Sequence, residues 1–267
     1  MRTTHVPTNC VVLLMLLLSS VTGFAQQSHI GKLTGNGKRG KELYRRYCIF
    51  CHGAYGDGMG ENAAYLDPKP RDFTKATFKC RSTPSGSLPL DGDLYDTISH
   101  GVHGSGMPSW KPLTRQQRVD LVAYVKGFSP RWEEEKPVAP LEIPAAPPNS
   151  VESARHGAEL FQNMNCWLCH GKEGRGNGPS AHTLTDSKGY PITPFDLTSG
   201  KQLKCGDSDR AMFRDLMTGL DGTPMPSFSG ALKPEEVWDL VHYIETLRAG
   251  NKRVIQATAE SKSETQN

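Results

Sequence analysis

The amino-acid sequence predicts a mainly α-helical protein that is built from two small modules in tandem. Three observations support this. Helical patterns open and close each half without convincing strand alternation, a five-residue cysteine motif occurs twice, and matched positions in the halves keep a nearly constant separation. The 267 residues are too many for one small module and suit two of ordinary size. We therefore expect one helical module in each half.

The repeated motif is Cys-x-x-Cys-His, at residues 48–52 and again at 166–170. This pattern is typical of a covalently bound c-type haem, in which two thiols form thioether bonds and the adjacent histidine reaches the iron. A zinc site or a thioredoxin-like pair is the alternative. It is disfavoured because neither half contains a second Cys-x-x-Cys or His-x-His pair, or a surrounding βαβ pattern.

The motif therefore predicts two covalently bound haem c groups. The expected thioether and proximal iron-ligand residues are Cys48, Cys51, Cys166, Cys169, His52 and His170. Only 36% of the residues are hydrophobic, so two porphyrins would supply part of the apolar core.

The two halves are related by a repeat. The haem motifs and two Met-Pro pairs are separated by 118 positions, and Tyr124 and Tyr243 by 119. A constant offset across loops of different composition indicates that the halves share a module through duplication.

The first 25 residues have the features of a signal peptide. Arg2 precedes an apolar run from Cys10 to Leu18, and small residues follow at 23 and 25. The run is shorter than the roughly 20 residues of a membrane-spanning helix, although an uncleaved anchor is the alternative. We expect export, to the periplasm in a bacterium, with membrane association only if this segment is retained.

The first predicted domain covers residues 29–131. A helical pattern from Lys41 to Tyr47 runs into the haem motif, and a Gly-rich loop follows at 53–60. Thr114 and Gln117 form a capping box before a closing helix that contains residues 121–125.

The second predicted domain covers residues 151–249 and follows a Pro-rich linker at 132–150. A helical pattern around residues 158–161 opens it, and Pro234 is a favourable start for a closing helix through Leu247. Residues 250–267 form a polar tail.

Met107 and Met225 are the candidate sixth ligands, because each follows the histidine of its own half by 55 residues. A thioether is a soft ligand that favours ferrous iron. The alternative is that both residues only fill the core. His103, and more weakly His100, compete with Met107 in the first half, but the second half has no equivalent histidine.

Cys80 and Cys205 remain of the seven cysteines once Cys10 leaves with the signal peptide and four thiols hold haem. They follow similar Asp-x-Thr segments at 72–74 and 196–198. In an oxidising compartment we expect a disulfide between the modules, with two separate buried thiols or an axial thiolate as alternatives.

Charge is uneven along the chain. Residues 29–131 contain 16 Lys and Arg against 9 Asp and Glu, whereas the rest of the mature chain has 14 against 19. A basic patch on the first module can steer an acidic redox protein toward it, although a solvated helix face is the alternative. The basic residues before the first haem motif are Lys38, Arg39, Lys41, Arg45 and Arg46. No feature supports nucleic-acid binding.

The order helix, Cys-x-x-Cys-His, Gly/Pro loops, Met-Pro and helix resembles a class I cytochrome c domain, and the tandem is similar to the dihaem cytochromes of the cytochrome c4 group. This resemblance implies a mainly α fold of two tandem class I cytochrome c domains, each a small helical module wrapped around a covalent haem. It assigns the thioether cysteines and proximal histidines named above, with Met107 and Met225 as distal ligands. The two additional cysteines, the insertions before each methionine and the long interdomain segment depart from the pattern.

We expect an exported electron carrier that passes single electrons between redox partners through two His/Met-ligated haems. Two alternatives remain: a dihaem enzyme, resembling thiosulfate dehydrogenases or peroxidases, with one open or Cys-ligated iron, and a cytochrome subunit of a larger oxidoreductase.

Overall fold

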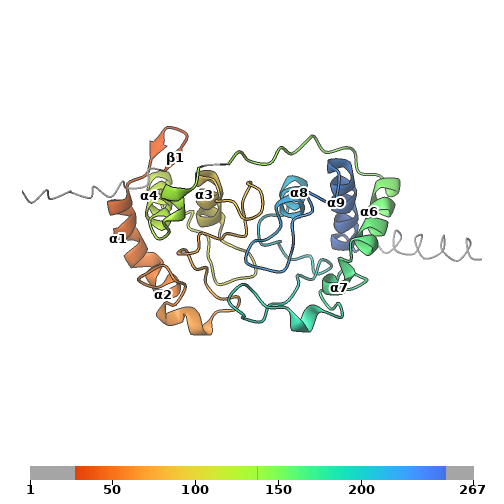
Figure 1. Ribbon diagram of the computed structural model, residues 1–267, viewed down its shortest axis with the longest axis horizontal. Helices are drawn as coiled ribbons and strands as arrows, with labels where there is room; N and C mark the ends of the chain where they lie inside the picture. Colours follow the sequence, from red (N-terminus) through yellow and green to blue (C-terminus); the bar gives the residue numbers. More distant parts are fainter. Residues whose placement is uncertain (1–27, 137, 251–267) are drawn as a thin grey trace, which may run out of the picture.

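Two helical modules lie side by side, and a linker crosses from one to the other along one edge (Figure 1). The computed structural model describes residues 28–136 and 138–250. The first module contains β1 (His29–Ile30), β2 (Leu33–Thr34), α1 (Gly37–Tyr47), α2 (Ile49–His52), the 3-10 helix η1 (Glu61–Tyr65), α3 (Asp91–His100), α4 (Arg115–Lys126) and α5 (Arg131–Glu134). The second contains α6 (Val151–Asn163), α7 (Trp167–His170), the 3-10 helix η2 (Ala181–Thr183), α8 (Asp209–Thr218) and α9 (Pro234–Arg248). The predicted mainly α fold is confirmed.

The first and last long helices of each module cross closely. α1 packs on α4, and α6 packs on α9. Each crossing contains a glycine: a Cβ atom on Gly40 or Gly157 would lie 2.0 Å from the carbonyl oxygen of Asp120 or Asp239, respectively. Only a residue without a side chain lets the two backbones approach this far.

The helix ends are set by local sequence. Thr114 accepts a hydrogen bond from the amide of Gln117 and the Gln117 side chain accepts one from the amide of Thr114, so the predicted capping box is present. α9 begins at Pro234, as predicted, since proline suits the first turn of a helix.

The middle helices α3 and α8 were not predicted from the sequence. Both bury apolar residues four positions apart on one face, Leu94 with Ile98 and Met212 with Leu216. Ser208 caps α8 by accepting a hydrogen bond from the amide of Ala211. The β1–β2 hairpin was not predicted either; it pairs two residues on each side in an antiparallel arrangement.

Each module has its own hydrophobic core. In the first, Tyr44 is buried against the rings of Tyr124 and Phe128, and its hydroxyl donates to the carbonyl of Gly53 at 2.7 Å. In the second, Phe213 lies against Trp238 with ring centroids 4.5 Å apart. The cores are therefore separate, as expected of two modules.

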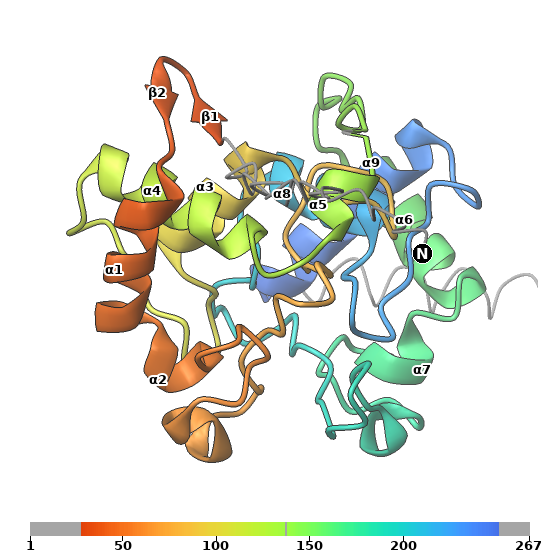
Figure 2. The same ribbon diagram turned by 60° about the vertical axis from the view of Figure 1, so that its left-hand side comes forward.

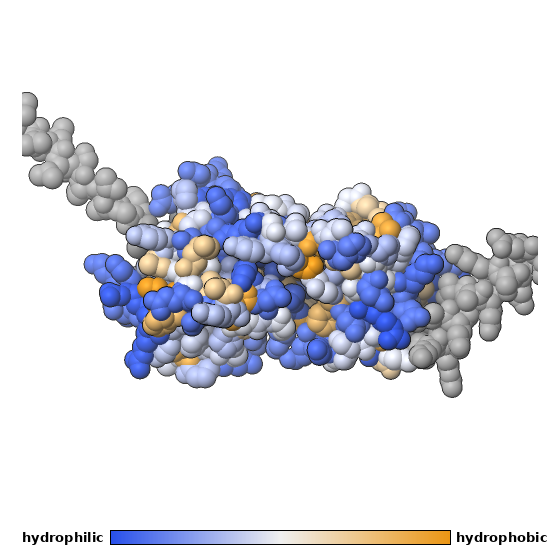
Figure 3. Space-filling model, turned by 90° about the horizontal axis from the view of Figure 1, so that it is seen from below, coloured by the Kyte–Doolittle hydropathy of each residue, from blue (hydrophilic) through white to orange (hydrophobic). Residues whose placement is uncertain are grey.

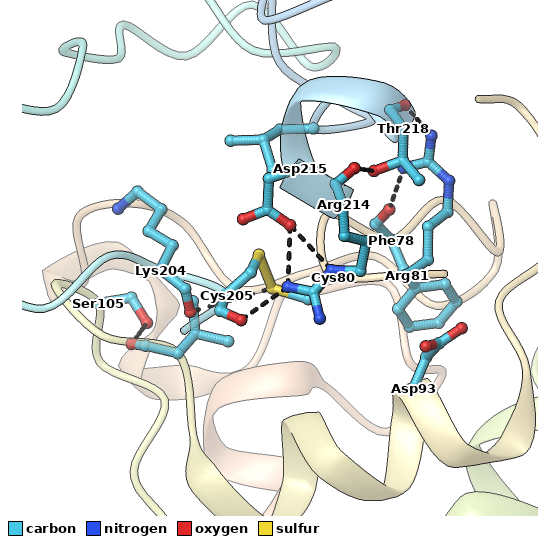
Figure 4. Close-up of a disulfide and its surroundings, with 12 residues drawn as sticks. Phe78, Cys80, Arg81, Asp93, Ser105, Lys204, Cys205, Arg214, Asp215 and Thr218 are labelled. Atoms are coloured by element: carbon cyan, nitrogen blue, oxygen red, sulfur yellow. Dashed lines mark hydrogen bonds and ion pairs between the residues drawn. A yellow bond between two sulfur atoms is a disulfide. The ribbon is translucent and has the colours of Figure 1, made fainter. Parts of the chain in front are cut away.

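A disulfide joins the modules and confirms the predicted pairing of Cys80 with Cys205 (Figure 4). Beside it, Arg81 is fully buried, pairs with Asp221 at 2.8 Å and donates to the carbonyl of Thr218 at 2.6 Å. Both partners belong to the second module, so the boundary is a packed and hydrogen-bonded interface.

The linker runs from Glu135 to Ser150, and the first three residues predicted to belong to it lie in α5 instead. Its Leu141 amide donates to the carbonyl of Ser82 at 2.7 Å, while Arg210 of the second module donates to the carbonyl of Ile143. The linker is thus attached to both modules. None of the described helices is long and apolar enough to cross a membrane. The predicted signal peptide, residue 137 and residues 251–267 lie outside the described part of the chain.

Candidate haem-binding sites

Each cysteine motif forms one helical turn at the end of a longer helix. In the first module, α1 ends at Tyr47 and the motif continues as α2; in the second, α7 follows α6 after a short turn at 164–166. The amide of His52 donates to the carbonyl of Cys48 at 2.9 Å, and that of His170 donates to Cys166 at the same distance. The two turns lie on the same side of the molecule, one in each module (Figure 2).

Both histidines are held in the form that binds metal. The Nδ1 atom of His52 lies 3.1 Å from the carbonyl oxygen of Arg71, and that of His170 lies 3.2 Å from the carbonyl oxygen of Phe195. A carbonyl oxygen accepts a hydrogen bond from a protonated Nδ1, so the proton of the neutral ring stays on Nδ1 and Nε2 has a free lone pair. Burial lowers the pKa of both histidines and so favours the neutral imidazole.

The Phe73 ring supports this arrangement in the first module. It stacks on His52 with the ring centroids 4.4 Å apart. The equivalent residue in the second module is Leu197, which also lies in a buried position. The imidazole orientation is therefore fixed by packing as well as by hydrogen bonding.

Glycines in the following loop let the chain return across each motif. The amide of Gly60 donates to the carbonyl of Cys51, and that of Gly178 donates to Cys169. A Cβ atom at Gly60 would lie 2.4 Å from the carbonyl oxygen of Phe50, and one at Gly178 would lie 2.3 Å from that of Leu168. The sequence indicated only a loop here; the regular spacing of these glycines after each motif was the available signal.

None of the four motif cysteines is in a disulfide, so all four are available for thioether bonds. Before haem is attached, burial raises the pKa of Cys48 to about 12 and that of Cys166 to about 11. A structural zinc site needs four ligands. No group of three or more His, Cys, Asp or Glu residues suited to a metal occurs within 28–136 and 138–250.

A cavity of about 680 Å3 lies next to the motif of the second module. Cys166, Cys169 and His170 line one part of it, and Met225 lines another. The remaining wall is mostly apolar and includes Phe161, Leu197, Leu203, Met212, Leu216, Phe228, Leu240 and Ile244. A flat apolar porphyrin with a thioether bond to each cysteine fits such a pocket in size and chemistry.

The two methionines lie in matching turns. The amide of Val102 donates to the carbonyl of Met107, and that of Leu220 donates to Met225, both at 3.1 Å. The amides of the methionines in turn donate to a nearby hydroxyl, at 3.2 Å in each case. Met225 lines the cavity and Met107 is half-buried. Their role as distal ligands stays a prediction.

The alternative candidates for the sixth iron ligand lie in different surroundings. His100 lies at the exposed end of α3 with its Nδ1 atom 3.0 Å from the carbonyl of Asp96. His103 is half-exposed in the turn before Met107. Cys80 and Cys205 are bound to each other, so neither provides the thiolate ligand that was an alternative.

Both modules match known families. Residues 154–248 match the family described as cytochrome c, and residues 35–125 match the one described as cytochrome c oxidase, cbb3-type, subunit III. Relatives include the Cbb3-type cytochrome c oxidase subunit FixP of Azorhizobium caulinodans, 26% identical over 219 residues, and subunit CcoP of Helicobacter pylori, 24% identical over 208 residues. These alignments cover 79% and 74% of this chain but only 59% of each relative, so the chain spans less than two thirds of their length.

A solved structure is more similar. The "Kuenenia stuttgartiensis reducing HAO-like protein complex" contains a chain that is 43% identical, with a TM-score of 0.77; the match covers 79% of this chain and 96% of that one. With a cytochrome c domain in each half, the protein belongs to the dihaem c-type cytochromes and carries two covalently bound haem c groups.

Proposed function

We propose that this cytochrome is an exported electron-transfer protein that passes single electrons between partner proteins. The observation that carries this proposal is the cavity of the second module, where a proximal histidine and a methionine share one apolar pocket. An iron bound by both would have no open position for a substrate, and the matching turns around Met107 support the same arrangement in the first module. Cys48, Cys51, Cys166 and Cys169 would form the thioethers, with His52 and His170 as proximal ligands.

Optical spectroscopy of the purified protein, in oxidised and reduced states with haemochrome quantification, tests this proposal. We expect two low-spin haems per chain and a weak red band from methionine-ligated ferric haem. Met107→Ala and Met225→Ala should each remove about half of that band, whereas Met59→Ala, a change at an exposed side chain, should not. A high-spin haem in the unmodified protein would instead favour an enzyme with an open iron.

The first module has the features of a docking surface for a redox protein. Four side chains near its haem motif are exposed by 50% to 87%, and we call them the apolar rim: Phe50, Tyr55, Met59 and Tyr65. The positions 118 residues later are Leu168, which is half-buried, and the exposed polar residues Glu173, Asn177 and Thr183. Figure 3, which views the molecule from below, shows several hydrophobic residues among hydrophilic ones over the first module.

Basic side chains lie on α1, which leads into the apolar rim. Lys38, Lys41, Arg45 and Arg46 are exposed. Arg39, predicted as part of the same patch, instead holds the buried Asp120 at 2.7 Å, so its charge is largely neutralised. An apolar centre beside positive charge suits a partner whose docking face is apolar and edged with carboxylates.

Small charged oxidants test this surface without the natural partner. In the Arg45→Glu/Arg46→Glu variant, oxidation by ferricyanide should slow several-fold at low salt, and its rate should lose its normal salt dependence. Oxidation by a cationic cobalt complex should become faster. Equal rates for variant and unmodified protein would place electron entry elsewhere.

Stable assembly into a larger oxidoreductase is the second candidate, and the 43% identity to a chain of a protein complex favours it. Cross-linking in the source organism followed by purification distinguishes the two candidates. A stoichiometric partner indicates a subunit, whereas recovery of the cytochrome alone indicates a free carrier. Export outside the cytoplasm, which the signal-like N-terminus supports, is part of both.

A further inference from the structure

The rim of the second haem cavity contains a lysine from each module. Lys79 precedes Cys80 of the disulfide, and Lys204 precedes Cys205, so the cross-link holds the two lysines in the same region. Both line the cavity that contains Cys166, Cys169, His170 and Met225. Lys79 therefore crosses the boundary, because it belongs to the first module and lines the pocket of the second.

Neither ammonium group has a carboxylate within ion-pair distance among residues 28–136 and 138–250. Lys204 donates to the carbonyl of Gly104 at 3.3 Å, and Lys79 makes no hydrogen bond with another described residue. Figure 4 shows the Lys204 side chain extending away from the disulfide and from Arg214. By contrast, the neighbouring cations Arg81, Lys188 and Arg214 each pair with an aspartate.

Both lysines occupy a region that disfavours an unpaired charge. Burial, together with the nearby Arg71 and the other lysine, lowers the pKa of Lys79 to about 8, and burial also lowers that of Lys204. Two carboxylates line the same cavity, but Asp215 pairs with Arg214 at 2.8 Å and Asp67 is exposed. The pocket thus contains two partly buried cations without a matching buried anion.

We propose that Lys79 and Lys204 bind the propionate carboxylates of the second module's haem, with Lys79 acting across the module boundary. A haem has two propionates, and this rim provides one lysine from each module, next to the covalent bond that joins them. Lys79 is then a positioning residue that also adds positive charge near the second iron. Such a charge favours the ferrous form and raises the reduction potential.

A potentiometric titration of single variants tests this inference. Lys79→Gln and Lys204→Gln should each reduce the equilibrium constant for reduction of the second haem about tenfold. For a one-electron couple this lowers the reduction potential by about 59 mV. Lys79→Arg should restore it. Lys75→Gln and Lys201→Gln remove the same charge from exposed positions of the same two modules and should leave both potentials unchanged. The wave of the second haem is identified by Met225→His, which replaces a residue of its own pocket.

Other outcomes overturn the inference. An unchanged second wave in Lys79→Gln would do so, as would a shift in the first wave alone. Added phosphate could also shift the reduction wave of the second haem in the unmodified protein but not in Lys79→Gln. That result would show that the lysines bind an anion from solution and not the propionates.

A measurement on the unmodified protein covers the case in which Lys79→Gln loses its haem. The NMR signals of the Lys79 side chain should shift between the ferric and ferrous forms, and those of Lys75 should not. Absence of that shift would contradict the inference.

The inference rests on the proposed haem ligation of the second module. Absence of a second haem wave from the unmodified protein would refute that ligation itself. Two waves that no lysine variant moves would refute only the role of the lysines.

Discussion

Gly40 of α1 crosses α4 so closely that a Cβ atom on it would lie 2.0 Å from the carbonyl oxygen of Asp120. The side chain of Asp120 then accepts hydrogen bonds from the amide of Asn36 and from Arg39, both near the start of α1. Backbone contact and ion pair therefore fix the angle at which α1 delivers the first haem motif.

Gly40→Ala should destabilise the first module, because the added methyl group forces the helices apart. We expect a loss of about 2 to 3 kcal/mol, typical of overpacking, measured as the free energy of unfolding in urea. Gly37→Ala is the matched control in the same helix, since a Cβ atom there meets nothing within 4 Å. It should be neutral or slightly stabilising; equal losses in both variants would contradict the role of the crossing.

Arg81→Met should destabilise the boundary between the modules. Its side chain is fully buried, and the change removes the ion pair of Asp221 and the hydrogen bond to the carbonyl of Thr218. Asp221 keeps its hydrogen bonds from Ser85 and Gly86. Breaking a buried pair of this kind costs about 3 to 5 kcal/mol. Arg175→Met breaks an exposed pair with Glu173 and should cost about 1 kcal/mol or less in the same unfolding experiment. A small effect at both positions would show that the boundary contributes little to stability.

Replacing both Cys80 and Cys205 with serine should lower stability while leaving the haem content unchanged. The disulfide closes a loop across a sequence separation of 125, and the unfolded chain gains conformational entropy without it. The expected loss is about 4 to 5 kcal/mol. The unmodified protein, unfolded in the presence of a reductant, should behave like the variant. If the variant kept its full stability, the disulfide would contribute nothing to the free energy of unfolding, and the interface would form without it.

Acid should weaken the boundary through Asp72. Burial there opposes ionisation, but hydrogen bonds from Thr74 and the ammonium of Lys188, 3.2 Å away in the other module, outweigh it and lower the pKa of Asp72. A lowered pKa stabilises the folded state above the ordinary value of 3.8, and this contribution disappears as the pH falls through the lower folded value. Between pH 6 and 2, the melting temperature of Asp72→Asn should therefore fall less steeply with acid than that of the unmodified protein.

Asp196→Asn provides the control for that comparison. Asp196 accepts the same two hydrogen bonds, from Thr198, and among the described residues it has no ion pair with the other module. The difference between the two variants reports the contribution of Lys188 together with the deeper burial of Asp72. Identical pH profiles would assign the whole effect to the local turn.

Motifs that act within a few residues could be predicted from the sequence. The haem turns, the capping box at Thr114 and the start of α9 at Pro234 depend on neighbours along the chain. The disulfide was also predictable, because only two cysteines remained after the haem motifs and the signal segment had been accounted for.

Features that depend on packing were missed. α3 and α8 are short, and their segments contain few apolar residues outside the positions that the fold buries. Gly40 and Gly157, at the helix crossings, could not be distinguished from other glycines in the sequence. A glycine is required there only because a second helix, about 80 residues further along the chain, packs against the backbone. The placement of Lys79 in the other module's cavity likewise depends on how the modules dock.

The linker and the disulfide together make a closed covalent ring. The segment from Cys80 to Cys205 begins in one module, passes through the whole linker and returns to the boundary in the other. A protease that cut the exposed linker once would produce two polypeptides that stay covalently joined. Separation of the two haem-bearing fragments on a gel would then require a reductant as well as the cut, so the two haems stay joined after damage to this exposed stretch.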